Sequence, residues 1–398
     1  MHPIPFVKPY ICGREAEYVA EVIRSGELDS EGRFTRGCAR LLEQRYGIHR
    51  ILMTPSCTAA LEMAAILCDL GSGDQVILPS YTFVSTANAA VLRGAEPVFV
   101  DIRPDTLNLD ERRIEAAITP RTKAIFPVHY AGVACEMETI CGIAERHGLL
   151  VVEDAAQGVH ASYRGRPLGS LGHLATYSFH TTKNYVCGEG GALCVNSPRL
   201  VRRAEILREK GTNRSQFYRG EVDKYSWIDI GGSHLPSELS CAFLLGQLEQ
   251  LDAINARRKE IFDSYRRQLE PLEVEGLLRL PIIPAECQPN YHMFYVLLPN
   301  MATRDALLAH LKEQGIGAVF HYVPLHTAPM GQRFGYQAAD LPVTVEMSGR
   351  LLRLPFYCEL TDDDLRRVVN TISAFLLHER SARRATVDAS VTRRALVE

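Results

Sequence analysis

The sequence lacks the features that would place the protein in a membrane, outside the cell or on nucleic acid. No apolar run approaches the roughly 20 residues needed to span a bilayer, and Met1–Pro9 lacks the apolar stretch of a signal peptide. The formal net charge of −3 provides no global positive field that would attract nucleic acid. We therefore expect a cytoplasmic protein without membrane insertion and without a nucleic-acid partner.

Paired cysteine motifs and a dinucleotide-binding loop are also missing. The 11 cysteines are scattered and none forms a Cys-x-x-Cys pattern. In a reducing compartment most cysteines are small buried apolar residues, so we expect no disulfide framework. The segment Gly188–Gly191 does not match the Gly-x-Gly-x-x-Gly loop of nucleotide-dependent oxidoreductases, which argues against that class.

What the sequence does contain is a regular alternation of strand and helix patterns. The 398 residues are enough for a large core divided between two lobes. Between Leu52 and Val195, apolar runs typical of buried strands alternate with helical patterns such as Thr58–Leu70 and Met137–His147. This alternation predicts an α/β fold with a mostly parallel sheet between helices. We expect a large domain over residues 1–250, a small α+β domain over 251–378 and a mobile tail over 379–398.

Two charged residues follow consecutive predicted strands. Asp154 ends an apolar run, and Lys183 follows the strand at Thr176–Phe179 after a turn rich in hydroxyl groups. Taken alone, Asp154 resembles a helix N-cap and Lys183 a solvated surface residue. Functional residues of such a sheet lie at the carboxyl ends of its strands, however, so both side chains can reach one bound ring. There a carboxylate pairs with a protonated ring nitrogen, and a lysine of lowered basicity serves as a nucleophile.

Hydroxyl and aromatic residues complete the pattern. Ser56–Thr58 opens a predicted helix, where such residues are most often caps. The same geometry also presents free N–H groups and the positive end of the helix dipole to an anion. The aromatic residues in Tyr81–Phe83 follow another strand end, where they either pack in the core or stack on a flat cofactor. Aromatic platform, anion cradle, acid and lysine occur in the order and spacing of one known architecture.

In these segments the chain resembles the fold-type-I pyridoxal phosphate (PLP) enzymes. More closely, it resembles the sugar aminotransferase family called DegT/DnrJ/EryC1/StrS, from about Phe6 to Leu377. Within that family the resemblance is strongest to the dTDP-4-amino-4,6-dideoxygalactose transaminases. The motifs that carry this closer match are Pro79–Asn88, Pro127–Met137, Arg208–Phe217, Phe320–His326 and Arg350–Phe356.

The resemblance implies a role for each matching residue of the cofactor site. Lys183 would hold PLP as a Schiff base and Asp154 would face its ring nitrogen, with PLP cycling through pyridoxamine 5′-phosphate. The other cofactor contacts would be Cys57, Thr58, Phe83, Gln157, Ser178 and Ser233. At Ser233 the chain departs from the family, because relatives commonly have Asn there and a cation at the position of Leu235.

The resemblance also implies the reaction and the substrates. L-Glutamate would donate the amine, and dTDP-4-keto-6-deoxy-D-glucose would accept it at carbon 4, for surface glycan biosynthesis in a homodimer with shared active sites. The diphosphate of the substrate needs cations, and the nearest candidates by their closeness in the sequence are Lys210, Arg214, Arg219 and Lys224. The other expected substrate contacts are Tyr81, His180, His321, Tyr322 and His326. We expect no metal, since Pro324 between two of these histidines argues against a helical pair of ligands.

Several alternatives remain open. Amination at carbon 3, or of a different nucleotide-linked keto sugar, would use the same site. A dehydratase branch of the family has histidine in place of the Schiff-base lysine, and Lys183 argues against it. A PLP-binding regulator would need a DNA-binding segment, and the sequence has no basic helical segment of that kind.

Overall fold

A seven-stranded sheet forms the centre of the larger part of the molecule. The computed structural model describes residues 2–395, and its main sheet has the strand order β1-β9-β8-β5-β4-β2-β3. Four of the six neighbouring pairs are parallel, while β9 is antiparallel to both β1 and β8. The predicted α/β fold with a mostly parallel sheet is confirmed. The strands are β1 Arg50–Thr54, β2 Gln75–Pro79, β3 Glu96–Val100, β4 Thr122–Ile125, β5 Leu150–Asp154, β8 Leu174–Ser178 and β9 Gly191–Val195.

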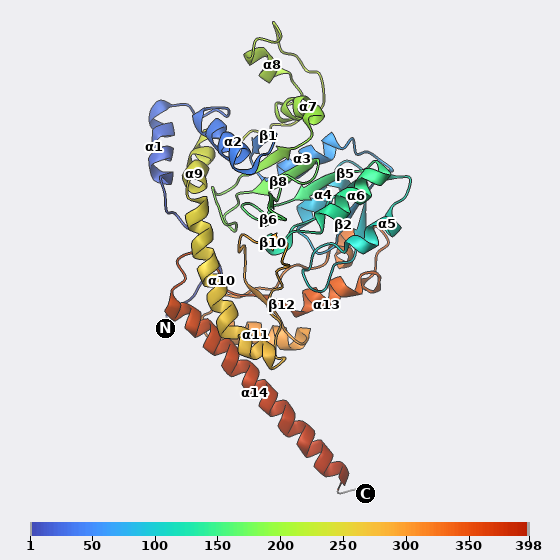
Figure 1. The fold of residues 1–398 in the computed structure, drawn as a ribbon, viewed down its shortest axis with the longest axis vertical. Helices are drawn as coiled ribbons and strands as arrows, with labels where there is room; N and C mark the ends of the chain where they lie inside the picture. The colour runs from blue at the N-terminus through green and yellow to red at the C-terminus, as the bar shows by residue number, and fades with distance from the viewer. Residues whose placement is uncertain (1, 396–398) are drawn as a thin grey trace.

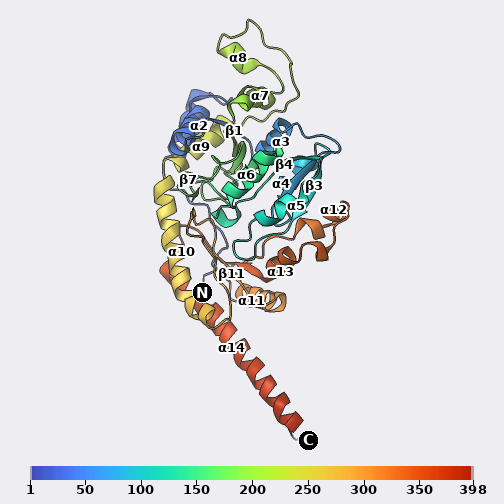
Figure 2. The same ribbon diagram turned by 45° about the vertical axis from the view of Figure 1, so that its right-hand side comes forward.

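Helices cover both faces of this sheet, as Figures 1 and 2 show. Side chains of a strand point alternately to the two faces: Val76 and Leu78 pack with the core beneath α3, whereas Ile77 packs with the core beneath α6. Both faces are therefore apolar, which explains the continuous apolar runs of the sequence. The helices of this part are α1 Glu15–Ser25, α2 Arg33–Tyr46, α3 Cys57–Leu67, α4 Val84–Val91, α5 Ile114–Ala117, α6 Met137–His147, α7 Pro198–Arg208, α8 Arg214–Tyr218 and α9 Glu238–Leu248.

A second apolar core lies below the sheet in Figure 1. It is formed by Ile4 and by residues between Ile261 and Leu376, with the antiparallel pair β11–β12 at its centre. The long helix α10 connects the two cores, because Ile254 packs with the sheet and Ile261 with the second core. The elements here are α10 Leu251–Val274, β11 Tyr295–Leu297, α11 Met301–Glu313, α12 Pro329–Gln332, α13 Pro342–Arg350, β12 Leu351–Arg353 and α14 Asp362–Ala395. The division at residues 250 and 251 stays a prediction.

Short elements link the two parts. A small sheet of order β10-β6-β7 pairs Cys287–Gln288 with Ser162–Tyr163, and the latter with Arg166–Pro167. Single 3-10 turns occur at Glu111–Arg113, Tyr130–Gly132, Leu325–Thr327 and Ala338–Asp340. These connections run between the sheet and the second core, so both can contribute side chains to one site.

Helix α14 includes most of the segment expected to be a tail. Thr361 begins it, because the Thr361 hydroxyl accepts from Asp364 N at 3.1 Å, the geometry of an N-cap. The helix then continues to Ala395 and projects away from the rest of the molecule in Figure 1. The segment over 379–395 is thus helical, its mobility stays a prediction, and residues 396–398 lie outside the described part. Over residues 2–395, no helix is long and apolar enough to cross a membrane.

Candidate active site

A cavity of about 610 Å³ opens where the sheet meets the second core. The carboxyl ends of β5 and β8 and the start of α3 form one side of it. Residues of the second core, including His292 and Arg353, form the other side. Ten of the residues expected at the site line this cavity together: Cys57, Thr58, Phe83, Asp154, Gln157, Ser178, His180, Lys183, His321 and Tyr322.

Asp154 is the last residue of β5, and its carboxylate is fixed by two hydrogen bonds. Thr86 Oγ1 donates to Asp154 Oδ2 at 2.6 Å, and Ala156 N donates to Oδ1 at 3.1 Å. The side chain is only 5% exposed, and a turn rather than a helix follows it. The N-cap interpretation therefore does not apply, and the held carboxylate lines the cavity instead.

Lys183 follows β8 and enters the same cavity. A turn closed by the bond from Lys183 N to His180 O, 2.9 Å, brings the chain back over the end of the strand. Burial lowers the pKa of the Lys183 amine, the negative fields of Cys57 and Asp154 oppose that change, and the positive field of Arg353 adds to it. Because the lowering dominates, the neutral amine that nucleophilic attack requires forms more readily than on a surface lysine.

The start of α3 presents backbone N–H groups to the cavity and can serve as a cradle for a phosphate group. Ser56 caps the helix, since its Oγ accepts from Ala59 N at 3.1 Å. The amides of Cys57 and Thr58 have no acceptor within the helix and are available to an anion. The backbone of Gly191 comes so close that a Cβ there would lie 2.4 Å from Cys57 N. Only glycine permits this approach, which places the hydroxyl-bearing end of β8 against the cradle.

Aromatic and amide side chains line another part of the cavity. Phe83 is 57% exposed although it is a large apolar residue, and its ring lies 6.4 Å from that of Tyr322. Gln157 Nε2 donates to the Tyr322 hydroxyl at 3.1 Å, while Gln157 Oε1 accepts from Ala131 N at 2.7 Å. An exposed ring at the edge of a polar cavity is suited to stacking on a flat ligand.

The two histidines of the cavity differ in their surroundings. His321 Nδ1 lies 3.0 Å from the Tyr130 hydroxyl, and burial shifts the His321 pKa well below its ordinary value. His180 is partly exposed and contacts Thr182 Oγ1 at 2.9 Å and Glu189 at 3.5 Å. His321 is thus a neutral hydrogen-bonding group in the enclosed part, and His180 lies at the edge.

Seven expected site residues do not line this cavity. Tyr81 lies behind Tyr322 in a buried aromatic cluster, with 5.7 Å between the ring centres. His326 is fully buried and bonds to Ser80 Oγ at 2.7 Å. Lys224 lines neither this cavity nor the pockets described next. The remaining four lie together in a second pocket of about 780 Å³: Lys210, Arg214, Arg219 and Ser233.

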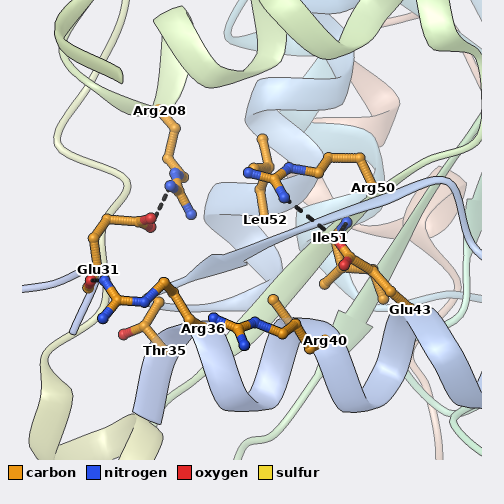
Figure 3. A pocket seen from close by; sticks show the side chains of 10 residues that line it. Glu31, Thr35, Arg36, Arg40, Glu43, Arg50, Ile51, Leu52 and Arg208 are labelled. Atoms are coloured by element: carbon orange, nitrogen blue, oxygen red, sulfur yellow. Dashed lines mark hydrogen bonds and ion pairs between the residues drawn. The ribbon is translucent and has the colours of Figure 1, made fainter. Parts of the chain in front are cut away.

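The second pocket adjoins a smaller one of about 210 Å³, shown in Figure 3. Both are lined by Glu31, Arg36, Arg50 and Arg208. Carboxylates neutralise much of their positive charge, since Arg208 pairs with Glu31 and Arg50 pairs with Glu205 at 3.1 Å. Neither pocket shares a lining residue with the Lys183 cavity.

Sequence reasoning missed three residues of the main cavity region. Thr86, which holds Asp154, gave no signal, because a hydroxyl on a helix is ordinary. His292 Nδ1 donates to Asn184 Oδ1 at 2.9 Å, and burial shifts the His292 pKa well below the ordinary value. Arg353 lies in the quoted motif Arg350–Phe356, where an arginine inside an apolar strand was a signal that went unused. Within residues 2–381, whose side chains are described, no cluster of three or more histidine, cysteine or acidic side chains has the arrangement of a metal site.

These features fit PLP. The Gly191 contact leaves a small polar cradle, Asp154 presents a hydrogen-bonded carboxylate, and Lys183 presents an amine of lowered pKa in one cavity. Anion cradle, carboxylate and amine correspond to the phosphate, the ring nitrogen and the carbonyl of the cofactor. The fold and this site define a PLP-dependent aminotransferase.

Comparison with known proteins gives the family. The model of the DegT/DnrJ/EryC1/StrS aminotransferase family matches residues 9–373. The chain belongs to this family and is a PLP-dependent sugar aminotransferase.

Individual relatives cover nearly the whole chain. It is 35% identical over 379 residues to the spore coat polysaccharide biosynthesis protein SpsC of Bacillus subtilis, covering 93% of this chain and 96% of that protein. The crystal structure of the aminotransferase TlmJ from Streptoalloteichus hindustanus has a TM-score of 0.87 at 30% identity, covering 95% and 100% of the two chains. The PLP form of the putative sugar aminotransferase Spr1654 from Streptococcus pneumoniae shares the fold, with a TM-score of 0.87 at 24% identity, covering 95% and 99%.

Proposed function

We propose that this enzyme transfers the amine of L-glutamate to carbon 4 of dTDP-4-keto-6-deoxy-D-glucose, giving dTDP-4-amino-4,6-dideoxy-D-galactose for surface glycan biosynthesis. The observation that carries the proposal is the meeting of Lys183 and Asp154 in one cavity, lined by residues of motifs that resemble those of the dTDP-4-amino-4,6-dideoxygalactose transaminases. Phe83 belongs to Pro79–Asn88, and His321 to Phe320–His326. The similarity to a spore coat polysaccharide biosynthesis protein supports a role in glycan assembly.

The cofactor would be held by residues of the large core. Bound PLP supplies an electrophilic carbonyl and an electron sink for amine transfer. The α3 cradle and Ser178 would bind the phosphate, and Phe83 and Gln157 would contact the ring. Asp154 would accept a charge-assisted hydrogen bond from the protonated ring nitrogen, which contributes about 1.5–3 kcal/mol. Thr86 and Ala156 fix the direction in which Asp154 accepts that bond.

Lys183 would carry the protons of both half-reactions. Its Nζ removes a proton from the α-carbon of glutamate, and in the second half it delivers a proton to carbon 4 of the sugar. Burial supports this role, because it lowers the pKa of the amine and so brings it closer to the operating pH. The neutral His321 and the Tyr322 hydroxyl would bind sugar hydroxyl groups at the opposite wall.

The enzyme would act as a homodimer with shared active sites. Lys210, Arg214, Arg219 and Ser233 line a pocket that shares no residue with the Lys183 cavity. Both views place α8, which begins at Arg214, at the end of the molecule opposite α11 and α14. Around it, Tyr218, Tyr225 and Trp227 are 68%, 52% and 80% exposed. These aromatic residues would be covered by a second copy, whose cavity would then receive the cations for the sugar diphosphate.

A coupled assay tests the substrate assignment. Purified enzyme loaded with PLP is mixed with dTDP-4-keto-6-deoxyglucose and glutamate, 2-oxoglutarate is measured, and the sugar product is examined by NMR. We expect stoichiometric 2-oxoglutarate and an amine on carbon 4 in the galactose configuration. Amination at carbon 3 would establish the alternative regiochemistry, and turnover only with another nucleotide sugar would refute the proposed acceptor.

The cytoplasmic location also stays a prediction.

A further inference from the structure

Arg353 places a guanidinium group in the cavity of Lys183. It is the last residue of β12, and its backbone is bonded to Val319 in both directions at 2.8 and 3.2 Å. The guanidinium carbon lies 4.8 Å from the centre of the Phe6 ring. Strand pairing and this cation–π contact hold the side chain in one place at the cavity wall.

No carboxylate neutralises this cation. Among the side chains that the structure describes, residues 2–381, no acidic group lies within 4.0 Å of the Arg353 nitrogens, whereas Arg50, Arg208 and Arg219 each have such a partner. Arg353 Nε is buried without a hydrogen-bond partner. Burial lowers the pKa of Arg353, and its other electrostatic neighbours are the phenols of Tyr130, Tyr322 and Tyr81. A buried guanidinium in this setting has its donors available for an anion from solution.

Arg258, a second arginine of the same cavity, shows the opposite arrangement. Its Nε donates to Tyr291 O at 2.9 Å and one terminal nitrogen donates to His292 O at 2.6 Å. Two backbone carbonyls thus satisfy Arg258, which supports the loop that carries His292. Of the two arginines on this wall, Arg353 is the one with unsatisfied donors.

The ligand must carry an anionic group that fits the guanidinium. That group must also lie close to the carbon on which Lys183 acts. Arg353 is close enough to Lys183 for its field to lower the lysine pKa. The α-carboxylate of an amino acid is one bond from the carbon that Lys183 deprotonates, whereas a nucleotide diphosphate is separated from the reacting sugar carbon by most of the sugar ring. A planar fork of N–H donors matches a carboxylate in two parallel hydrogen bonds.

We propose that Arg353 binds the α-carboxylate of the amino donor and thereby orients its α-carbon toward Lys183. The inference rests on the proposed function only for the identity of the donor, glutamate. It assigns a subsite on the wall formed by the second core, facing the cofactor residues of the large core. The keto sugar, which has no carboxylate, would not depend on this guanidinium.

The test uses the holoenzyme in the donor half-reaction alone, without any sugar. Arg353→Met removes the charge with little change of volume, Arg353→Lys keeps a charge without the fork, and Arg350→Met is a matched control. Arg350 precedes β12, pairs with Glu346 and does not line the cavity. The decay of the yellow aldehyde form and the release of 2-oxoglutarate are followed as glutamate is varied. Glutarate binding is measured by calorimetry as a readout independent of turnover.

We expect Arg353→Met to raise the half-saturating glutamate concentration about 10- to 100-fold, with a smaller rise for Arg353→Lys and none for Arg350→Met. Glutamine and alanine, which lack the second carboxylate, should show the same relative loss. An unchanged glutamate dependence would overturn the proposal, and so would a loss confined to glutamate and glutarate, which would assign Arg353 to the distal carboxylate. A rise of the sugar KM equal to that of glutamate would also overturn it.

The experiment distinguishes a failure of this subsite from a failure of the proposed acceptor. If the donor half-reaction depends on Arg353 but dTDP-4-keto-6-deoxyglucose is not aminated, the carboxylate subsite stands and the acceptor is wrong. Thermal unfolding of each holoenzyme variant shows whether it is folded. Should Arg353→Met unfold, Arg353→Lys carries the same test, because it retains a cation for the contact with the Phe6 ring.

Discussion

Lys183 and Arg353 in the main cavity differ from Arg208 and Arg219 in the pockets beside α8. Beside α8, Arg208 pairs with Glu31, and Glu205 accepts from Arg219 at 3.0 Å. In the main cavity Lys8 pairs with Glu359 at 2.8 Å, but neither Lys183 nor Arg353 has a carboxylate within 4.0 Å among the side chains described, residues 2–381. Paired charges can stabilise a fold, whereas a buried cation without a partner is costly and persists where a ligand or a reaction needs it.

The difference also shows that cations close together in the sequence are not all available to bind a ligand. Lys210, Arg214, Arg219 and Lys224 were grouped by their closeness in the sequence, and all but Lys224 line one pocket. Arg219 is already neutralised, since it pairs with Glu205 and also with Glu221 at 2.6 Å. An anionic substrate would have to compete with these two acids, so Arg219 should contribute less than Lys183 or Asp154.

Replacing Lys183 should have the largest effect. Lys183→Ala removes both the covalent attachment and the proton carrier, so we expect turnover to fall at least about 10⁴-fold. Steady-state 2-oxoglutarate release measures the loss, with the exposed Lys123→Ala as control and thermal unfolding as a check of the fold. Activity within a hundredfold of wild type would remove Lys183 from the centre of the mechanism.

Asp154→Asn should have the next largest effect. The amide keeps the shape of the side chain and can still accept from Thr86, but it cannot hold a proton on the ring nitrogen. We expect kcat/KM to fall about 10²- to 10³-fold, or roughly 3–4 kcal/mol in the transition state. Thr86→Val, which removes only the supporting bond, should lose less. Equal losses in the two variants would show that orientation rather than charge is the role of Asp154.

Arg208→Met tests the structural side of the comparison. The Arg208 side chain is 4% exposed while Glu31 is 40% exposed, so the lost pair is screened on one side. We expect the free energy of unfolding to fall by about 1–2 kcal/mol, measured by denaturant titration, with glutamate kinetics unchanged. A large change of the glutamate KM at normal stability would mean that this paired arginine has a catalytic role after all.

Arg214→Ala should give a smaller effect that is confined to the sugar. If Arg214 contacts the diphosphate from a second subunit, the KM of the nucleotide sugar should rise about tenfold while the donor half-reaction is unaffected. Arg267→Ala, an exposed arginine on α10, is the matched control. Loss of the donor half-reaction as well would contradict separate binding regions for the two substrates.

The smallest effect is the contribution of Lys183 to stability. Burial lowers its pKa in the folded chain from the ordinary value of 10.5, so between these two values the unfolded chain binds more protons. Stability of the apoprotein should therefore rise with pH in that window, by about 1.4 kcal/mol per unit of pKa lowering. The difference in unfolding free energy between wild type and Lys183→Met isolates this group. A loss of wild-type stability relative to Lys183→Met as the pH rises would mean that the pKa is raised.

Much of the fold and part of the site followed from the sequence, for reasons that can be stated. Apolar runs followed by Asp154 and Lys183 predicted strand ends, and adjacent parallel strands bring such ends together. Ser56 was readable as a cap because its hydroxyl bonds locally. The contact of Thr86 with Asp154 depends on packing between distant segments, and no local pattern encodes it. Arg353 did give a local signal, an arginine inside an apolar strand, but only the packed structure shows that it lines the cavity. The sequence placed His326 among the substrate contacts for the same reason. Only tertiary packing shows that its ring is bonded to the Ser80 hydroxyl instead.

The most direct test of the central claim is to locate the cofactor on the chain. Holoenzyme is reduced with borohydride, digested, and the labelled peptide is sequenced by mass spectrometry. The account predicts one label per chain, on Lys183, and none in Lys183→Ala treated in the same way. A label on any other lysine would contradict the assignment of this cavity as the active site.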